Sequence, residues 1–193
     1  MNLMVRGNVG WMSVNVLLAA VPFLLALVLF VPRRPRTFAW WIGVGTFVAF
    51  LPNAPYVLTD VVHLRSQVQA AQTDLQVAGL FVEYGVLMLT GVVLYGASLA
   101  ILRRTLAMEG LARWRWPAEL ALHAVCSIGI FLGRFLRLNS WDILARPGAV
   151  LQYVRVPHPS TVVIIGVTFV VLFTAATALR VPLAIHDLRR ASR

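Results

Sequence analysis

Two polar stretches interrupt this otherwise apolar chain, and they carry the residue types that bind ions or transfer protons. FLPNAPYVLTDVVHL covers residues 50–64 and GIFLGRFLRLNSWDIL covers residues 129–144, each after an apolar run. Their charged, titratable and amide side chains include Asp60, His63, Arg134, Arg137, Asn139 and Asp142. Burying such groups near lipid is expensive unless they pair with one another or serve a site. We therefore expect the functional residues in these two stretches.

The composition is that of an integral membrane protein. The chain is 60% hydrophobic and only 12% charged, so its polar side chains are too few to cover a globular surface. The net charge of +10 comes from arginines in short blocks beside apolar runs, without an aromatic and basic binding motif. The expected partner is the lipid bilayer and not nucleic acid, and the sequence leaves a homo-oligomer open.

Five apolar stretches approach the roughly 20 residues that a helix needs to cross a bilayer. We expect a single transmembrane domain over residues 1–193, built as an all-α bundle. The expected spans are residues 13–31, 38–52, 79–102, 118–136 and 160–184.

The second span ends in a Pro-Asn-Ala-Pro stretch. Pro52 and Pro55 remove backbone donors and disfavour helix in the residues before them. We expect the helix to break there and to restart at about Tyr56. The restarted piece places Asp60 and His63 three residues apart, on one helical face.

The arginine blocks predict the orientation. They follow the first and third expected spans and fill the C-terminal tail, and such blocks are typical of cytoplasmic ends. The N-terminus is then outside, the C-terminus is cytoplasmic, and both polar stretches lie at the outer face. Arg134, Arg137, Arg146 and Arg155 fall on the outer side against this rule, although the first two belong to the candidate site.

Three blocks resemble the signature of the bacterial membrane-protein family called domain of unknown function 1361. They are NVLLAAVPFLL (residues 15–25) and the two polar stretches. The resemblance implies a protein of the bacterial inner membrane but no established activity. The residues it carries over are Asn15, Pro22, Asn53, Pro55, Tyr56, Asp60, His63, Gly133, Arg134, Arg137, Asn139, Ser140, Trp141 and Asp142. Glu83 in LFVEYG stands where the family has an acidic residue early in the following span.

Two interpretations of these residues involve no catalysis. In the first, Asp60 or Asp142 neutralises the arginines in a structural ion-pair network. In the second, Arg134 and Arg137 bind an anionic lipid or another anionic ligand, because guanidinium groups on one helix face offer donors in a fork. The ligand-binding residues would then be Asn53, Tyr56, Arg134, Arg137, Asn139, Ser140 and Asp142.

Two further interpretations involve chemistry or transport. Asp60, His63 and Glu83 are candidates for catalysis in a membrane-embedded hydrolase, as general base and orienting group. Asp60, His63 and Asp142 are candidate ligands for a divalent metal such as zinc, although nothing in the sequence requires a cofactor. HExxH, GxSxG, P-loop and CxxC patterns are absent. A proline-broken helix beside charges also occurs in transporter subunits.

Two features of the remaining spans predict architecture. His123 in the fourth span is expected to be hydrogen-bonded inside the bundle rather than to act as a ligand. Gly85, Gly91 and Gly96 in the third span indicate close helix packing, without the spacing of a strict GxxxG motif.

Overall fold

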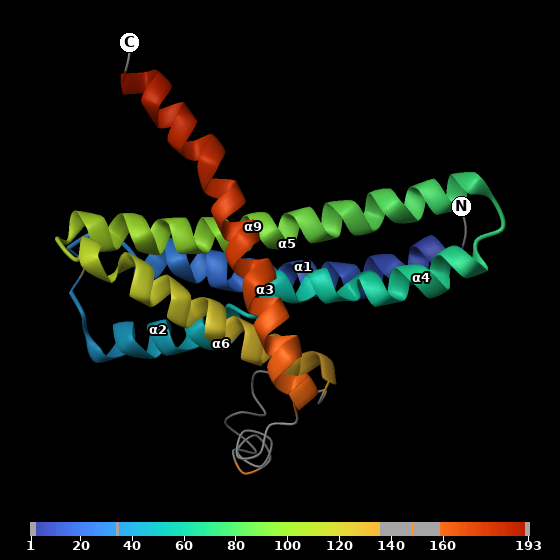
Figure 1. The fold of residues 1–193 in the computed structure, drawn as a ribbon, viewed down its shortest axis with the longest axis horizontal. Coiled ribbons are helices and arrows are strands. Elements are labelled where there is room, and N and C mark those ends of the chain that lie inside the picture. Colours follow the sequence, from blue (N-terminus) through green and yellow to red (C-terminus); the bar gives the residue numbers. More distant parts are fainter. Residues whose placement is uncertain (1–2, 34, 136–147, 149–158, 192–193) are drawn as a thin grey trace. The chain divides into compact units, whose positions relative to one another are not determined.

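The computed structural model describes the chain except for residues 1–2, 34, 136–147, 149–158 and 192–193 (Figure 1). This described part contains helices and turns but no strand. Five of its helices are long and apolar enough to cross a membrane. They are Gly10–Leu29, Phe38–Ala70, Asp74–Met108, Ala112–Phe135 and Pro159–Leu179. The predicted all-α class with five membrane helices is confirmed.

The chain divides into two compact units, Met1–Ile101 and Leu102–Arg193. Unit 1 holds α1 (Leu3–Leu29), α2 (Phe38–Phe50), α3 (Asn53–Tyr56), the 3-10 helix η1 (Val57–Asp60), α4 (Val61–Ala70) and most of α5 (Asp74–Met108). Unit 2 holds the end of α5, the 3-10 helix η2 (Ala112–Trp114), α6 (Arg115–Phe135) and α9 (Pro159–Ala191). The single domain over residues 1–193 stays a prediction.

The second span is a series of short helical segments. The Thr37 hydroxyl caps the start of α2 by accepting a hydrogen bond from Trp40 N at 3.3 Å. The α-helix ends at Phe50 and resumes at Asn53, three residues before the expected restart at Tyr56. Leu51 and Pro52 keep right-handed helical dihedrals, and residues 38–70 count as one span. A complete break at the prolines stays a prediction.

The helices extend beyond the expected apolar stretches. α1 begins at Leu3 and α5 at Asp74, before the expected starts at residues 13 and 79. Polar capping contacts explain the early start of α5, because Gln76 N donates to Thr73 Oγ1 at 3.3 Å and Gln72 N donates to Gln76 Oε1 at 2.8 Å. A count of apolar residues overlooks such polar first turns.

α5 lies directly against the short helices of unit 1 at Gly91. A Cβ on Gly91 would overlap the carbonyl oxygen of Ala54 and a methyl group of Val57, both of which are buried residues. At Gly85 a Cβ would meet no described residue within 4 Å. The close packing expected from these glycines is therefore present at Gly91 and absent at Gly85.

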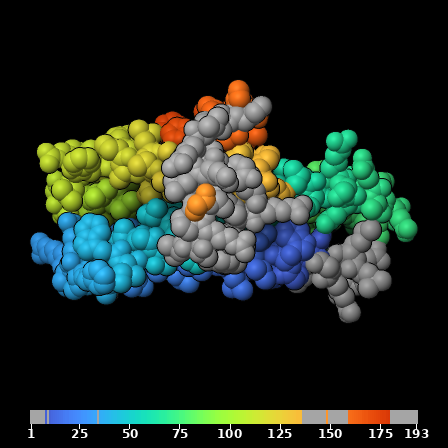
Figure 2. Space-filling view, turned by 90° about the horizontal axis from the view of Figure 1, so that it is seen from below, coloured from blue at the N-terminus to red at the C-terminus, as the bar shows by residue number. Residues whose placement is uncertain are grey.

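The two ends of unit 1 are formed by different segments. In the space-filling view α2 appears in light blue at one end, and the green residues of α4 and the loop after it form the other (Figure 2). The ribbon shows the same separation (Figure 1). The polar residues described next follow α4 and the N-terminal half of α1, away from α2.

Candidate functional site

Two amide contacts join α1 to the segment formed by η1 and α4. Asn8 Nδ2 donates to Gln67 Oε1 at 2.7 Å, and Gln67 Nε2 donates back to Asn8 Oδ1 at 2.8 Å. Asn15 Nδ2 donates to Asp60 Oδ2 at 3.0 Å. Asn8 and Asn15 lie two helical turns apart, as do Asp60 and Gln67. The two segments therefore run antiparallel in one register.

Aromatic side chains occupy the interval between these contacts. The ring centroid of Trp11 lies 6.0 Å from that of His63 and 6.1 Å from that of Tyr84 on α5. Trp11 Nε1 donates to Asn8 Oδ1 at 3.2 Å, which fixes the indole beside the amide pair. We call the resulting set the polar seam. Its members are Asn8, Trp11, Asn15, Asp60, His63, Gln67, Glu83 and Tyr84.

The polar seam combines deeply buried groups with accessible ones. Asp60 is 2% exposed, Asn8 5% and Tyr84 1%, whereas His63 is exposed. A carboxylate as buried as that of Asp60 needs hydrogen-bond donors to offset its lost hydration. The Asn15 amide is one such donor. The seam therefore reaches from accessible surface into the core of unit 1.

Glu83 and Tyr84 are members of the seam whose side chains make few polar contacts with the described residues. Glu83 is half-buried, and Oε2 lies 3.5 Å from Asn8 Nδ2, an amide that donates at much shorter range to Gln67. Among the described residues no cationic side chain lies within ion-pair distance of Glu83. The buried Tyr84 hydroxyl has no hydrogen-bond partner among them either. This hydroxyl lies within electrostatic range of the Asp60 and Glu83 carboxylates.

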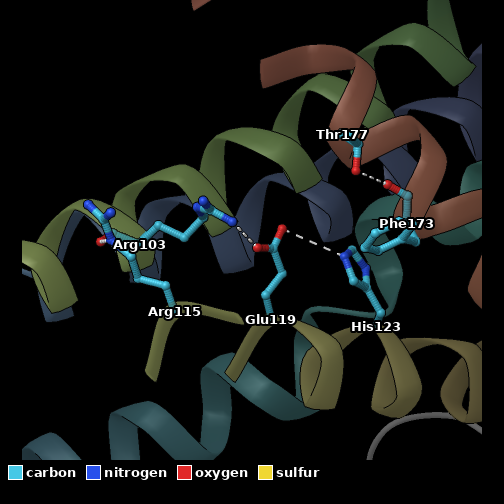
Figure 3. A network of polar contacts seen from close by, with 6 residues as sticks. All are labelled: Arg103, Arg115, Glu119, His123, Phe173 and Thr177. Atoms are coloured by element: carbon cyan, nitrogen blue, oxygen red, sulfur yellow. Dashed lines mark hydrogen bonds and ion pairs between the residues drawn. The ribbon is translucent and has the colours of Figure 1, made fainter. Parts of the chain in front are cut away.

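A second polar cluster lies in unit 2 (Figure 3). Arg103 Nη1 on α5 donates to Glu119 Oε2 on α6. The other carboxylate oxygen of Glu119 lies 3.7 Å from His123 Nε2. The rings of Phe169 and Phe173 on α9 stand edge-on to the imidazole, each with its centroid 5.9 Å away. We call Arg103, Glu119 and His123 the buried triad.

The structure brings some of the predicted site residues together and separates others. Asp60, His63 and Glu83 belong to the polar seam of unit 1. Asn53 instead caps the local backbone, because Nδ2 donates to Phe50 O at 3.0 Å. Tyr56 is half-buried, and its carbonyl accepts from the Thr59 hydroxyl at 2.7 Å.

The predicted residues of the second polar stretch are described only in part. Arg134 is half-buried in the last turn of α6, in unit 2. Arg137, Asn139, Ser140 and Asp142 lie outside the described residues. Their convergence with the first stretch therefore stays a prediction, as do the candidate catalytic and metal sites. Where the structure describes the chain, no group of three or more His, Cys, Asp or Glu residues could hold a metal ion.

The sequence assigned no site role to several members of these clusters, namely Asn8, Trp11, Gln67, Tyr84 and Glu119, whereas Asn15 and His63 were expected. Asn8, Trp11 and Asn15 share one face of α1, and His63 and Gln67 share one face of α4, so polar spacing along a helix was the available signal. In unit 2, Glu119 and His123 stand four residues apart in an apolar span, which was again a signal of one shared face. In the sequence, Arg103 served only to predict which end of its span is cytoplasmic.

A comparison with protein-family models finds the family that the three sequence blocks resemble. The model described as Protein of unknown function (DUF1361) matches residues 14–175. The chain belongs to this family. The suspected membership is thereby confirmed. No curated protein and no solved structure matches the chain.

The DUF1361 match covers most of both clusters. Asn15, Asp60 and Glu83 lie inside it, as do all three residues of the buried triad. Asn8 and Trp11 precede its first residue. Because the family description carries no activity, the function of this DUF1361 protein has to be argued from the chemistry of its side chains.

Proposed function

We propose that this DUF1361 protein is a membrane-embedded binding protein whose polar seam binds the ammonium group of a lipid head group. One observation carries the proposal: half-buried Glu83 has no cationic partner among the described residues, and it stands beside the buried Tyr84 hydroxyl that also lacks a partner there. A carboxylate inside a membrane span is costly and is typical of a functional site. A bound cation would offset that cost.

The residue types of the seam suit an ammonium group. Its N–H groups can donate to the Glu83 carboxylate and to the Tyr84 hydroxyl oxygen. The Trp11 indole lies beside the Tyr84 ring and offers an aromatic face, on which an organic cation is stabilised by about 0.5 to 2 kcal/mol. Carboxylate and aromatic groups together favour an organic cation over an anion.

The position of the seam favours a lipid as the source of this cation. Asn15 lies in the span Gly10–Leu29, and Glu83 and Tyr84 lie in the span Asp74–Met108. Molecules that reach these spans laterally are lipids. Among common membrane lipids, phosphatidylethanolamine carries a primary ammonium group with three N–H donors, and we take it as the ligand class.

An anionic ligand stays a second prediction from the sequence. Its expected donors are Arg134, in unit 2, and residues 137–142, outside the described part of the chain. The proposed location is the bacterial inner membrane, with the N-terminus outside and the C-terminus cytoplasmic. The arginine blocks support this orientation, and labelling a Gln69→Cys variant from outside intact cells tests it.

Native mass spectrometry of the purified protein tests lipid selection. The protein is exchanged into nanodiscs that contain equal amounts of phosphatidylethanolamine and phosphatidylcholine. We expect retained lipid to be enriched in phosphatidylethanolamine. Glu83→Gln should lower that enrichment by about tenfold or more, and Tyr84→Phe by about fivefold, because they remove a charged and a neutral hydrogen-bond partner.

Two control variants separate binding from general damage. Asp74→Asn removes an exposed acid from the same helix, and Tyr95→Phe removes a buried hydroxyl three turns away from Tyr84. Both should keep the wild-type enrichment. Equal retention of the two lipids by the wild type, or enrichment that survives in Glu83→Gln, would refute the proposal.

A further inference from the structure

The buried triad forms a graded path from accessible surface to the interior of unit 2. The side chain of Arg103 is 23% exposed, that of Glu119 2% and that of His123 0%. Arg103 lies near the end of α5, close to the turn into α6, and the Trp116 ring lies 5.2 Å from its guanidinium carbon. Glu119 therefore connects a partly accessible cation with a fully enclosed imidazole (Figure 3).

Charges inside a membrane span are expensive, and this cluster contains more titratable groups than an ion pair requires. Arg103 and Glu119 alone would form a neutral pair. His123 adds a titratable imidazole, and its Nε2 faces the second carboxylate oxygen of Glu119. Chains of Glu and His residues at membrane depth are typical of proton pathways.

We propose that Glu119 and His123 form a proton-binding site that is reached from the Arg103 end of the triad. A hydronium ion gives its proton to Glu119 Oε1 and leaves as water. The carboxylic acid then gives the same proton to His123 Nε2, which restores the carboxylate beside Arg103 and leaves an imidazolium. Nothing is oxidised or reduced, and the net change is one proton moved from hydronium to His123, with one water released.

The distance between Glu119 Oε1 and His123 Nε2 fits a resting site in which the two groups come closer for proton transfer. The 3.7 Å between Glu119 Oε1 and His123 Nε2 is longer than a hydrogen bond. Proton-transfer contacts are often long in the resting state and tighten on function. Because the two residues are one turn apart on α6, a side-chain rotation is enough to bring them together.

In the part of the chain that the structure describes, Glu119 is the acid that lies near the imidazole. α5 contributes Arg103, which contacts the far carboxylate oxygen. α9 contributes the Phe169 and Phe173 rings. On α6 itself, the Ser127 hydroxyl donates to the backbone oxygen of His123 at 2.7 Å, and Cys126 follows one turn along. Charge on His123 should therefore depend on Glu119 more than on Ser127.

Nitrogen NMR of ¹⁵N-histidine-labelled protein in detergent measures this proton directly. The chain has four histidines, and the signal lost in His123→Gln identifies the residue. We expect the wild-type signal to change from the neutral to the charged form as the solution is acidified. In Glu119→Gln the change should require about a tenfold higher proton concentration or more, because a neutral amide stabilises imidazolium less than a carboxylate does.

The same NMR titration of a control variant shows whether the effect is specific to Glu119. Ser127→Ala removes a buried hydroxyl from the same helix without touching the imidazole, so its titration should match the wild type. If Glu119→Gln does not fold, Glu119→Asp provides the comparison, since a shorter side chain withdraws the carboxylate from Nε2. A His123 signal that never changes with pH, or that titrates identically in the Glu119 variant, would overturn the proposal.

Discussion

Asn15 Nδ2 donates to Asp60 Oδ2 at 3.0 Å and joins the middle of α1 to the end of η1. Two turns towards the N-terminus, Asn8 and Gln67 exchange a reciprocal pair of amide hydrogen bonds in the same antiparallel register. Polar side chains thus set the alignment of two segments of the membrane helices. A slip of either helix by one turn would break both contacts at once.

The Asn15–Asp60 contact predicts a measurable loss of stability. Asn15→Ala removes an amide donor from a buried carboxylate, and we expect the free energy of unfolding to fall by about 1 to 3 kcal/mol. Val14→Ala changes a neighbouring residue that is exposed on the same helix and should cost less. Thermal unfolding in detergent compares the two variants. Equal stability of Asn15→Ala and the wild type would show that the contact contributes nothing.

The antiparallel register predicts which positions can be cross-linked. In a Cys126→Ala background, the double variant Asn8→Cys with Gln67→Cys should react with a short bifunctional thiol reagent, because their side chains meet. Asn8→Cys with Gln69→Cys should react much less, since two residues along a helix turn the side chain to another face. Mass spectrometry of tryptic peptides gives the yields. Similar yields for both pairs would contradict the register.

Close packing at Gly91 predicts opposite effects for two glycines of α5. Gly91→Ala places a methyl group against the Ala54 carbonyl oxygen, which cannot move without shifting α3, so we expect a loss of about 1 to 3 kcal/mol. Gly85→Ala meets no described residue within 4 Å and should leave stability unchanged or raise it by up to about 1 kcal/mol. Thermal unfolding of both variants in the same detergent decides the matter. Equal changes in stability for the two variants would contradict the close contact between Gly91 of α5 and Ala54 of α3.

The ion pair of unit 2 predicts a compensating double variant. Arg103→Ala leaves the Glu119 carboxylate buried without its guanidinium partner, and we expect a loss of about 3 to 5 kcal/mol. Combining it with Glu119→Gln removes the stranded charge and should recover much of that loss. The comparison is made by thermal unfolding of the wild type, the two single variants and the double variant. Losses that simply add in the double variant would mean that the two side chains act independently.

Hydropathy predicted the membrane class and the five helices that could cross a membrane. It could not predict the partners of their polar side chains, because the pairing of Asn8 with Gln67 arises from tertiary packing across 59 residues of chain. The early start of α5 was overlooked because its first turn is polar. Glu119 was overlooked because a single acid near the start of an apolar span resembles an interfacial charge, whereas the structure buries it beside Arg103.

Solid-state NMR measures the proposed contact between Glu83 and an ammonium group directly. The protein carries ¹³C-labelled glutamate and is reconstituted with phosphatidylethanolamine labelled with ¹⁵N in its head group. The chain has three glutamates, so Glu83→Gln assigns the signal of interest. We predict a dipolar contact that corresponds to a distance of about 3.5 Å between the ammonium nitrogen and the carboxylate carbon, as in a charged hydrogen bond. A wild-type spectrum without this contact, or one in which Glu83→Gln leaves it unchanged, would contradict the account.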